Sequence, residues 1–259
     1  MINFLKGVRL IFWGTLTIVL VATLVVVSVW KNSQKAPPMK LGELTKVTSY
    51  YSTDYQKAIR KSRESSVRIV SSSPKFLGLS SSSGTYFESK GKYYVITTQH
   101  GILGSCSSLS ATHEGVFYQC EKIAVADENI DYAIVEIEGP ILDRTPIRIP
   151  RDLATQEQQT RSYSILSPVI YTGYPNTIGP LTLRGNVIGY GGTDYLYMFS
   201  YAYAGSSGSG IFGENGKYVG YVIALDVGVT EYGIDILENM VLVVPAFKID
   251  WNALADSTN

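Results

Sequence analysis

The sequence contains few of the residues that bind metals or respond to redox conditions. Among 259 residues there are two cysteines and two histidines, and no group of them has the spacing of a metal site. Glycine-rich phosphate-binding loops are absent as well, because the glycines near Gly185 and Gly191 precede neither a lysine nor a helical pattern. We therefore expect no metal and no cofactor.

An excess of charge of one sign is also lacking, since 22 Lys and Arg residues balance 22 Asp and Glu residues. The distribution is uneven. Residues 1–46 hold six basic residues and one acid, which leaves 16 basic and 21 acidic residues in 47–259. An acidic main body argues against nucleic acid as a partner. A hydrophobic content of 45% and an aromatic content of 12% exclude a disordered chain.

One long apolar run stands apart, because residues 10–30 carry no charge. As a helix they would extend roughly 31 Å, about the thickness of a bilayer core, with Trp13 and Trp30 at the two interfaces. A cleaved signal peptide would have a shorter apolar region and small residues at its cleavage site, whereas Trp30 ends the run here. The sequence predicts a transmembrane helix over 10–30, after a stub of residues 1–9 and before a linker of residues 31–48. Basic residues on both sides leave its orientation open.

The rest of the chain has the pattern of a β protein preceded by one helix. Residues 50–65 place apolar side chains at helical spacing, which predicts a short helix. Beyond it, β-branched or aromatic runs alternate with Gly, Ser, Asn and Asp at intervals of roughly 8–12 residues, as in all-β barrels and sandwiches. The runs of this kind are 67–70, 85–87, 93–97, 133–137, 187–189, 196–199 and 218–225.

Other stretches read as connections. The serine-rich residues 71–73 and 80–83 are predicted to be loops. A cluster of prolines within 140–150 indicates a link between two β units, residues 67–140 and 160–250.

Three short stretches carry the residue types that acyl transfer by a serine requires. They are residues 94–101, 129–135 and 204–212, which contain His100, Asp131 and Ser207 respectively. Such chemistry needs a hydroxyl nucleophile, an imidazole that takes its proton, a carboxylate that orients the imidazole, and backbone N–H donors for the oxyanion. Each stretch alone has an ordinary structural reading: a strand-end histidine, a turn aspartate and a flexible loop. Their order and spacing together favour catalysis.

The three stretches together resemble the chymotrypsin-fold serine proteases, specifically the trypsin-like HtrA/Deg branch. Thr97-Thr98-Gln99-His100 is similar to that family's Thr-x-x-His, Asp131-Tyr132-Ala133-Ile134-Val135 to its Asp-Leu-Ala-Val-Leu, and Gly205-Ser206-Ser207-Gly208-Ser209 to its Gly-Asn-Ser-Gly-Gly. The resemblance covers about residues 50–250. It implies an all-β fold of two six-stranded, chymotrypsin-like β-barrels and a trypsin-like protease domain over residues 49–254.

The resemblance also implies a role for each matching residue. Ser207 would be the nucleophile, His100 the general base and then acid, and Asp131 the carboxylate that orients the imidazole. The backbone N–H groups of Gly205 and Ser207 would form the oxyanion hole.

Two neighbouring serines and a second histidine have to be weighed against these assignments. Ser206 and Ser209 compete for the role of nucleophile, and Ser207 is preferred because it alone has the Gly-x-Ser-Gly register. His113, the other histidine, lies in a predicted hairpin turn and is interpreted as a surface residue.

The match has departures that bear on activity and specificity. Ser206 stands where the family has Asp or Asn, and Val222 where many members have a polar residue near the buried Asp. A catalytically silent fold therefore stays open as an alternative. Tyr201 replaces an Asp at the base of the specificity pocket, which argues against cleavage after Lys or Arg. An apolar pocket, and cleavage after apolar residues, is expected from Tyr201, Ile223, Ala224 and Leu225.

The two cysteines, Cys106 and Cys120, flank a predicted two-residue turn at His113 and Glu114. Such a turn pairs positions whose numbers sum to 227, and the numbers of the cysteines sum to 226, so the two lie nearly opposite each other. We predict a disulfide between them, which favours a periplasmic, luminal or extracellular location. Two separate buried thiols are the alternative.

Together these features predict a single-pass membrane protein whose folded domain is a serine endopeptidase that acts on proteins or peptides. One alternative is a catalytically silent trypsin-fold module that binds peptides at a membrane. Another is a membrane-anchored adhesion protein with a β-sandwich. The sequence indicates no particular oligomeric state.

Overall fold

The computed structural model describes residues 21, 23, 53–73, 78–148, 163–192, 194–230, 233–252 and 254, without the side chains of 224–238. Residues 1–47 and 48–259 form two separate units. The predicted stub, membrane helix and linker lie outside the described residues, except for the helical Val21 and Thr23. No helix within the described ranges combines the length and the apolar character that crossing a membrane requires.

One helix and the strands of the first barrel come first along the chain. They are α2 (Thr53–Ser65), β1 (Ser66–Ser73), β2 (Gly78–Ser89), β3 (Lys92–Thr97), β4 (Leu109–His113), β5 (Val116–Asp127), β6 (Tyr132–Ile137) and β7 (Ile147–Arg148). The second barrel follows with β8 (Pro168–Gly173), β9 (Leu181–Gly191), β10 (Tyr195–Phe199), β11 (Gly210–Gly213), β12 (Tyr218–Thr230) and β13 (Gly233–Pro245).

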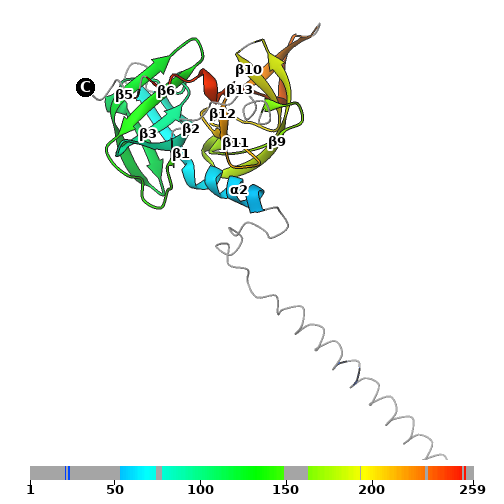
Figure 1. Cartoon of the computed structure of the whole chain (residues 1–259), viewed down its shortest axis with the longest axis horizontal. Coiled ribbons are helices and arrows are strands. Elements are labelled where there is room, and N and C mark those ends of the chain that lie inside the picture. The colour runs from blue at the N-terminus through cyan, green and yellow to red at the C-terminus, as the bar shows by residue number, and fades with distance from the viewer. Residues whose placement is uncertain are drawn as a thin grey trace, which may run out of the picture. The chain divides into compact units, whose positions relative to one another are not determined.

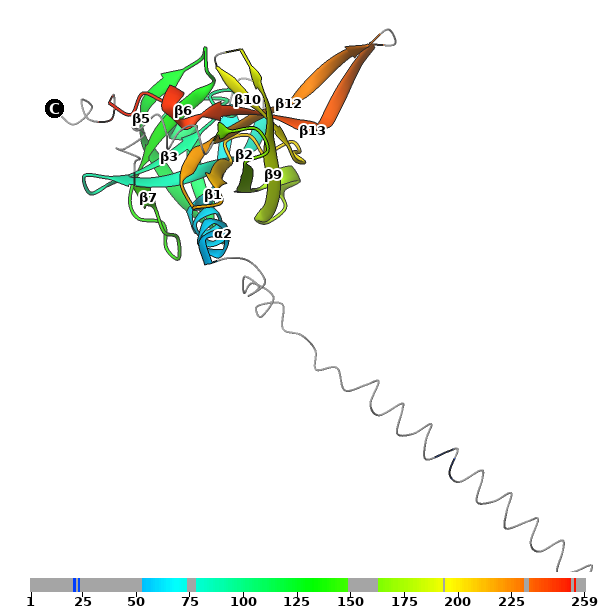
Figure 2. The same cartoon turned by 45° about the vertical axis from the view of Figure 1, so that its right-hand side comes forward.

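Both sets of strands close into barrels that lie side by side (Figure 1). The order in barrel one is β1-β4-β5-β6-β3-β2, and pairing of β1 with β2 closes it. Strand β7 adds in parallel to β2, outside this closed set. Barrel two closes in the order β10-β13-β12-β11-β8-β9, and Figure 2 shows the outer parts of β12 and β13 projecting from it as a paired ribbon. The prediction of two six-stranded barrels is confirmed.

The central strands of barrel one contribute to two cores because successive side chains point to opposite faces of a strand. In β3, Val95 packs inside barrel one, whereas its neighbours Tyr94 and Ile96 join a cluster that both barrels share. In β6, Val135 and Ile134 divide in the same way. Both faces of these strands are therefore buried, and the apolar cluster between the barrels fixes the two barrels against each other.

Helix α2 lies along the seam between the barrels (Figure 1). Tyr55 and Ala58 are buried on one side of the helix and pack against Ile170 of β8. Asp54 in the first turn and Arg63 in the last turn complement the helix dipole. The helix predicted within residues 50–65 is confirmed.

The prediction of serine-rich loops at 71–73 and 80–83 is wrong. These residues belong to β1 and β2, and the two strands pair with Ser71 opposite Ser80. Closure of the barrel supplies hydrogen bonds along the whole ladder, which outweighs the modest strand propensity of serine. The Ser71 side chain also contributes, since its hydroxyl accepts a hydrogen bond from the Leu103 N–H at 2.9 Å.

The hairpin between β4 and β5 turns one residue later than predicted. His113 pairs with Val116, so Glu114 and Gly115 form the turn, with φ angles of +49° and +81°. Glycine at the second position suits such a turn because it adopts positive φ without strain.

Cys106 and Cys120 are joined by the predicted disulfide, which links the segment before β4 to β5, with the two Cα atoms 5.2 Å apart.

Removal of this disulfide should destabilise the domain, because the unfolded chain then gains conformational freedom. The two cysteines are 14 residues apart, and closing a loop of that size is worth about 3 kcal/mol. We expect the double substitution Cys106→Ser and Cys120→Ser to lower the free energy of unfolding by that amount, measured by urea titration of the full-length chain. Reductant should cause the same loss in the unmodified protein and none in the double variant; equal midpoints for all samples would contradict the prediction.

Candidate active site

The pairing of β3 with β6 brings two of the predicted site residues together. The strands run antiparallel, with Thr97 opposite Ala133. The chain that leaves β3 and the chain that enters β6 therefore lie at the same edge of barrel one. His100 follows Thr97 by three residues, and Asp131 precedes Ala133 by two.

His100 and Asp131 make two direct contacts at this edge. The His100 Nδ1 atom lies 2.6 Å from Asp131 Oδ2, and the backbone N–H of His100 donates to Asp131 Oδ1 at 2.9 Å. Because a carboxylate only accepts, the contact places the imidazole proton on Nδ1. Nε2 makes no hydrogen bond to any described residue, and the His100 side chain is 52% exposed. The oriented imidazole is thus half exposed, with an Nε2 that no described residue binds.

Two further features hold the carboxylate in place. Asp131 has a φ of +54°, and its backbone carbonyl accepts a hydrogen bond from the Gln99 N–H. The Tyr221 hydroxyl from barrel two donates to the carbonyl of the preceding residue, Ile130, at 2.7 Å. Burial raises the pKa of Tyr221, and the Asp131 charge raises it further, so this hydroxyl remains a proton donor. Val222, predicted to leave Asp131 short of a donor, is buried in the core of barrel two, and the His100 N–H supplies a second donor instead.

Within residues 205–209, just before β11, two of the five backbone N–H groups have no partner among the described residues. The N–H groups of Ser206, Gly208 and Ser209 donate to the carbonyls of Tyr203, Val222 and Ser206 at 2.8, 2.7 and 3.0 Å respectively. By contrast, the N–H groups of Gly205 and Ser207 donate to no group among the described residues. Gly205 has a φ of +93° and Gly208 a φ of +87°, conformations that residues with a Cβ rarely adopt. The loop therefore holds, next to the Ser207 side chain, two donors that no described residue uses.

The three neighbouring serines differ in accessibility. Ser206 and Ser209 are buried, with exposures of 1% and 0%, whereas Ser207 is half-buried. The Ser206 hydroxyl accepts a hydrogen bond from the Tyr203 N–H. The Ser207 hydroxyl donates to the carbonyl of Ile223 at 3.0 Å, and within the described ranges no hydrogen bond joins it to His100. The structure thus brings His100 and Asp131 together and leaves Ser207 directed toward Ile223.

Sequence reasoning missed one residue that connects the two barrels at this loop. Ser83 of β2 donates from its N–H to the carbonyl of Ser207 at 2.8 Å and from its hydroxyl to the carbonyl of Gly205 at 2.7 Å. The same hydroxyl accepts from the Tyr174 N–H, and the Ser83 carbonyl accepts from the Thr97 hydroxyl. A serine from barrel one therefore positions the loop of barrel two. The one signal in the sequence is the Ser83-Gly84 pair, which precedes the apolar run predicted as a strand at 85–87.

The predicted specificity residues are only partly described. Tyr201 is 50% exposed, and its carbonyl accepts a hydrogen bond from the Tyr171 hydroxyl. Ile223 is buried, at 6% exposure. The side chains of Ala224 and Leu225 lie outside the described residues. In the described part of the chain, no three His, Cys, Asp or Glu residues are grouped so that they could hold a metal ion.

The interpretation of His113 as a surface residue is wrong. Its side chain is 11% exposed, and its Nδ1 accepts hydrogen bonds from Arg144. The turn lies one residue further along, so His113 ends β4 and packs inward rather than capping the hairpin.

Comparison with known proteins agrees with this architecture. The model of a trypsin-like peptidase domain matches residues 82–220. Among solved structures, a serine endoprotease from Yersinia pestis is 20% identical with a TM-score of 0.59, and the match covers 80% of this chain and 68% of that one. A protease from M. tuberculosis in its active form is 17% identical with a TM-score of 0.58, covering 78% of this chain and 84% of that one. A search of curated proteins gives no match.

The loop geometry predicts an unusual sensitivity at Gly208. A Cβ there would lie 2.0 Å from the Ser83 carbonyl oxygen, and the φ of +87° adds strain. We expect Gly208→Ala to lower the free energy of unfolding by more than about 3 kcal/mol, as estimated for backbone clashes in packed sites and measured by urea titration.

The control is Gly91→Ala, in a turn with a similar φ of +78° and no atom within 4 Å of the added Cβ. Gly91→Ala should lower the free energy of unfolding only by the strain of a positive φ, about 1–2 kcal/mol. Equal losses for the two variants would contradict the inferred contact with Ser83.

Proposed function

The chain belongs to the trypsin-like peptidase family, and we propose that it is a serine endopeptidase that uses Ser207 as nucleophile, His100 as general base and Asp131 as orienting carboxylate. Its substrates would be proteins or peptides. The contact between His100 and Asp131 at 2.6 Å is the observation that supports the proposal most directly. It leaves Nε2 as the only ring nitrogen available for a proton from a hydroxyl group.

The proposed reaction begins with a rotation of the Ser207 side chain. Its hydroxyl leaves the Ile223 carbonyl and turns about the Cα–Cβ bond toward His100 Nε2. Nε2 then takes the proton while Oγ attacks the carbonyl carbon of the substrate. The imidazolium formed is stabilised by the Asp131 carboxylate, and it returns the proton to the leaving amine. Water repeats the sequence on the acyl-enzyme, with His100 again acting as base.

The negative charge that develops on the substrate oxygen requires donors that are fixed before the reaction. The N–H groups of Gly205 and Ser207 are suited to this role because they have no partner among the described residues. The other three amides of residues 205–209, by contrast, are all hydrogen-bonded. Their bonds hold the two free donors in position, so stabilising the oxyanion needs little reorganisation.

We also propose that residues 10–30 anchor the domain to a membrane, on the periplasmic or extracellular side. The uncharged length of this segment supports anchoring. The disulfide between Cys106 and Cys120 supports an oxidising compartment for the domain. A tether of this kind would raise the effective concentration of substrates that lie near the membrane.

A fluorophosphonate probe tests the nucleophile directly. We expect it to label the full-length chain on Ser207, and Ser207→Ala to abolish labelling. His100→Ala should slow peptide hydrolysis by about 10³-fold or more, because the hydroxyl then lacks a base.

The matched control is Ser209→Ala. Ser209 lies two residues away, and its hydroxyl has no partner among the described residues, so its loss should leave labelling intact. Peptide binding without any labelling of Ser207 would instead identify the catalytically silent module. Labelling that persists in Ser207→Ala would refute the choice of nucleophile.

Membrane anchoring is tested by extracting cell membranes with alkaline carbonate. We expect the full-length chain to stay in the membrane pellet and the double variant Leu20→Arg and Leu24→Arg to be released. An arginine at the centre of a membrane helix costs about 2.5–3.5 kcal/mol. Ser207→Ala should stay in the pellet, which excludes self-cleavage as the cause of release. Release of the unmodified chain would contradict the proposal.

A further inference from the structure

A cavity of about 410 Å³ lies apart from the candidate active site, at the junction of α2, the β4–β5 hairpin and the start of barrel two. None of His100, Asp131 and Ser207 lines it. Its walls include the charged or titratable residues Arg63, Arg68, His113, Glu114 and Arg144, together with Tyr174. The volume falls within the range of small-molecule sites, about 300–1,000 Å³.

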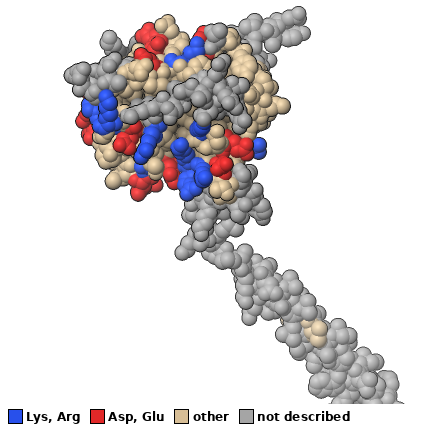
Figure 3. Space-filling model, viewed as in Figure 1, with Lys and Arg blue, Asp and Glu red and all other residues tan. Residues whose placement is uncertain are grey.

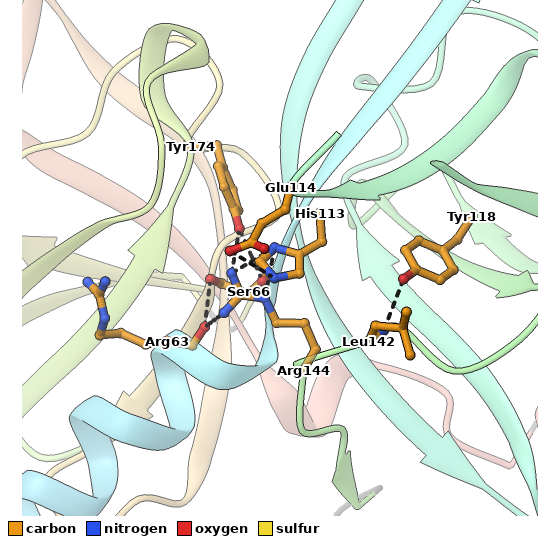
Figure 4. Close-up of polar contacts among 8 residues, drawn as sticks. All are labelled: Arg63, Ser66, His113, Glu114, Tyr118, Leu142, Arg144 and Tyr174. Carbon is orange, nitrogen blue, oxygen red and sulfur yellow. Dashed lines mark hydrogen bonds and ion pairs between the residues drawn. The ribbon is translucent and has the colours of Figure 1, made fainter. Parts of the chain in front are cut away.

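The Arg144 side chain connects the other residues of the cavity wall (Figure 4). Its guanidinium donates to the Arg63 carbonyl at 2.6 Å, to His113 Nδ1 at 3.0 and 3.2 Å, and to the Tyr174 hydroxyl at 3.3 Å. The loop that carries Arg144 is fixed as well, since the Leu142 N–H donates to the Tyr118 hydroxyl at 2.9 Å. The wall is therefore rigid before any ligand arrives, which lowers the entropic cost of binding.

The other two arginines are also held by neutral partners. Arg68 donates to the Thr177 carbonyl and lies over the Tyr174 ring, 5.2 Å from its centroid. Its Nε is buried with no hydrogen-bond partner among the described residues. Arg63 donates to the Thr182 hydroxyl at 2.8 Å. Within the described ranges none of the three guanidinium groups forms an ion pair.

The charge of the lining is unbalanced. Burial lowers the pKa of His113, and the nearby Arg144 lowers it further, so this imidazole is neutral at neutral pH. Glu114 is the one carboxylate of the lining, and its side chain is 76% exposed at the hairpin turn. The guanidinium groups of Arg63, Arg68 and Arg144 therefore exceed the opposing charge by two.

We propose that this cavity binds a phosphate-bearing small molecule. A phosphate monoester carries nearly two negative charges at neutral pH, which matches the excess charge of the lining. Guanidinium groups bind phosphate oxygens through paired, charge-assisted hydrogen bonds. Acidic and basic side chains are interspersed over the face seen in Figure 3, which favours a small anion held in the cavity over an extended polyanion on the surface.

Calorimetric titration of the full-length chain with inorganic phosphate and with glucose 6-phosphate tests the proposal at constant ionic strength. We expect both to bind, and Arg63→Gln and Arg68→Gln each to weaken binding about tenfold or more, the worth of one charge-assisted contact. Arg144→Gln should abolish binding; its circular dichroism spectrum separates this effect from unfolding.

The matched control is Arg60→Gln, an exposed arginine on the same helix as Arg63 that does not line the cavity. It should bind phosphate as the unmodified chain does. Equal weakening by Arg60→Gln and Arg63→Gln would reduce the effect to overall charge and overturn the proposal. Absence of phosphate binding, or equally tight binding of the dicarboxylate succinate, would overturn it too. None of these outcomes depends on peptidase activity, because Ser207→Ala should bind phosphate unchanged.

Discussion

The arrangement of the candidate active site depends on one residue, Ser83, which fixes the loop of barrel two to barrel one. Its N–H and hydroxyl donate to the carbonyls of Ser207 and Gly205. Its own carbonyl accepts from Thr97, in the strand that leads to His100. The loop that carries Ser207 and the strand that leads to His100 are therefore both hydrogen-bonded directly to the same residue. A displacement between the barrels would therefore break these bonds.

The barrels contribute different parts of the site, and a different structural feature positions each part. In barrel one the antiparallel register of β3 and β6 brings His100 beside Asp131. In barrel two the glycines at 205 and 208, each with a φ near +90°, allow a turn in which the N–H groups of Gly205 and Ser207 have no partner among the described residues. The apolar cluster between the barrels packs against both parts and holds them together. Hydrogen bonds through Ser83 then set the relative position of the two parts.

The sequence carried the elements of the site that are local in the chain. Thr-x-x-His, the Asp before a buried strand and Gly-x-Ser-Gly are each contiguous, so His100, Asp131 and Ser207 could be chosen without a structure. Ser83 could not, because its role comes from contacts with residues far along the chain, and a run of serines has the composition of a loop. The same limit explains the error at His113, whose burial follows from where the hairpin turns and from Arg144 reaching it.

Tyr174 shows how the cavity and the candidate active site are connected. Its hydroxyl and ring lie in the cavity wall, against Arg144 and beneath Arg68. Its backbone N–H donates to Ser83, whose hydroxyl donates in turn to Gly205. Two hydrogen bonds therefore join the backbone of Tyr174, whose side chain lines the cavity, to the Gly205 carbonyl. Because this route runs through the backbone of Tyr174 and Gly205, it connects the cavity wall to the position of the loop that carries Ser207.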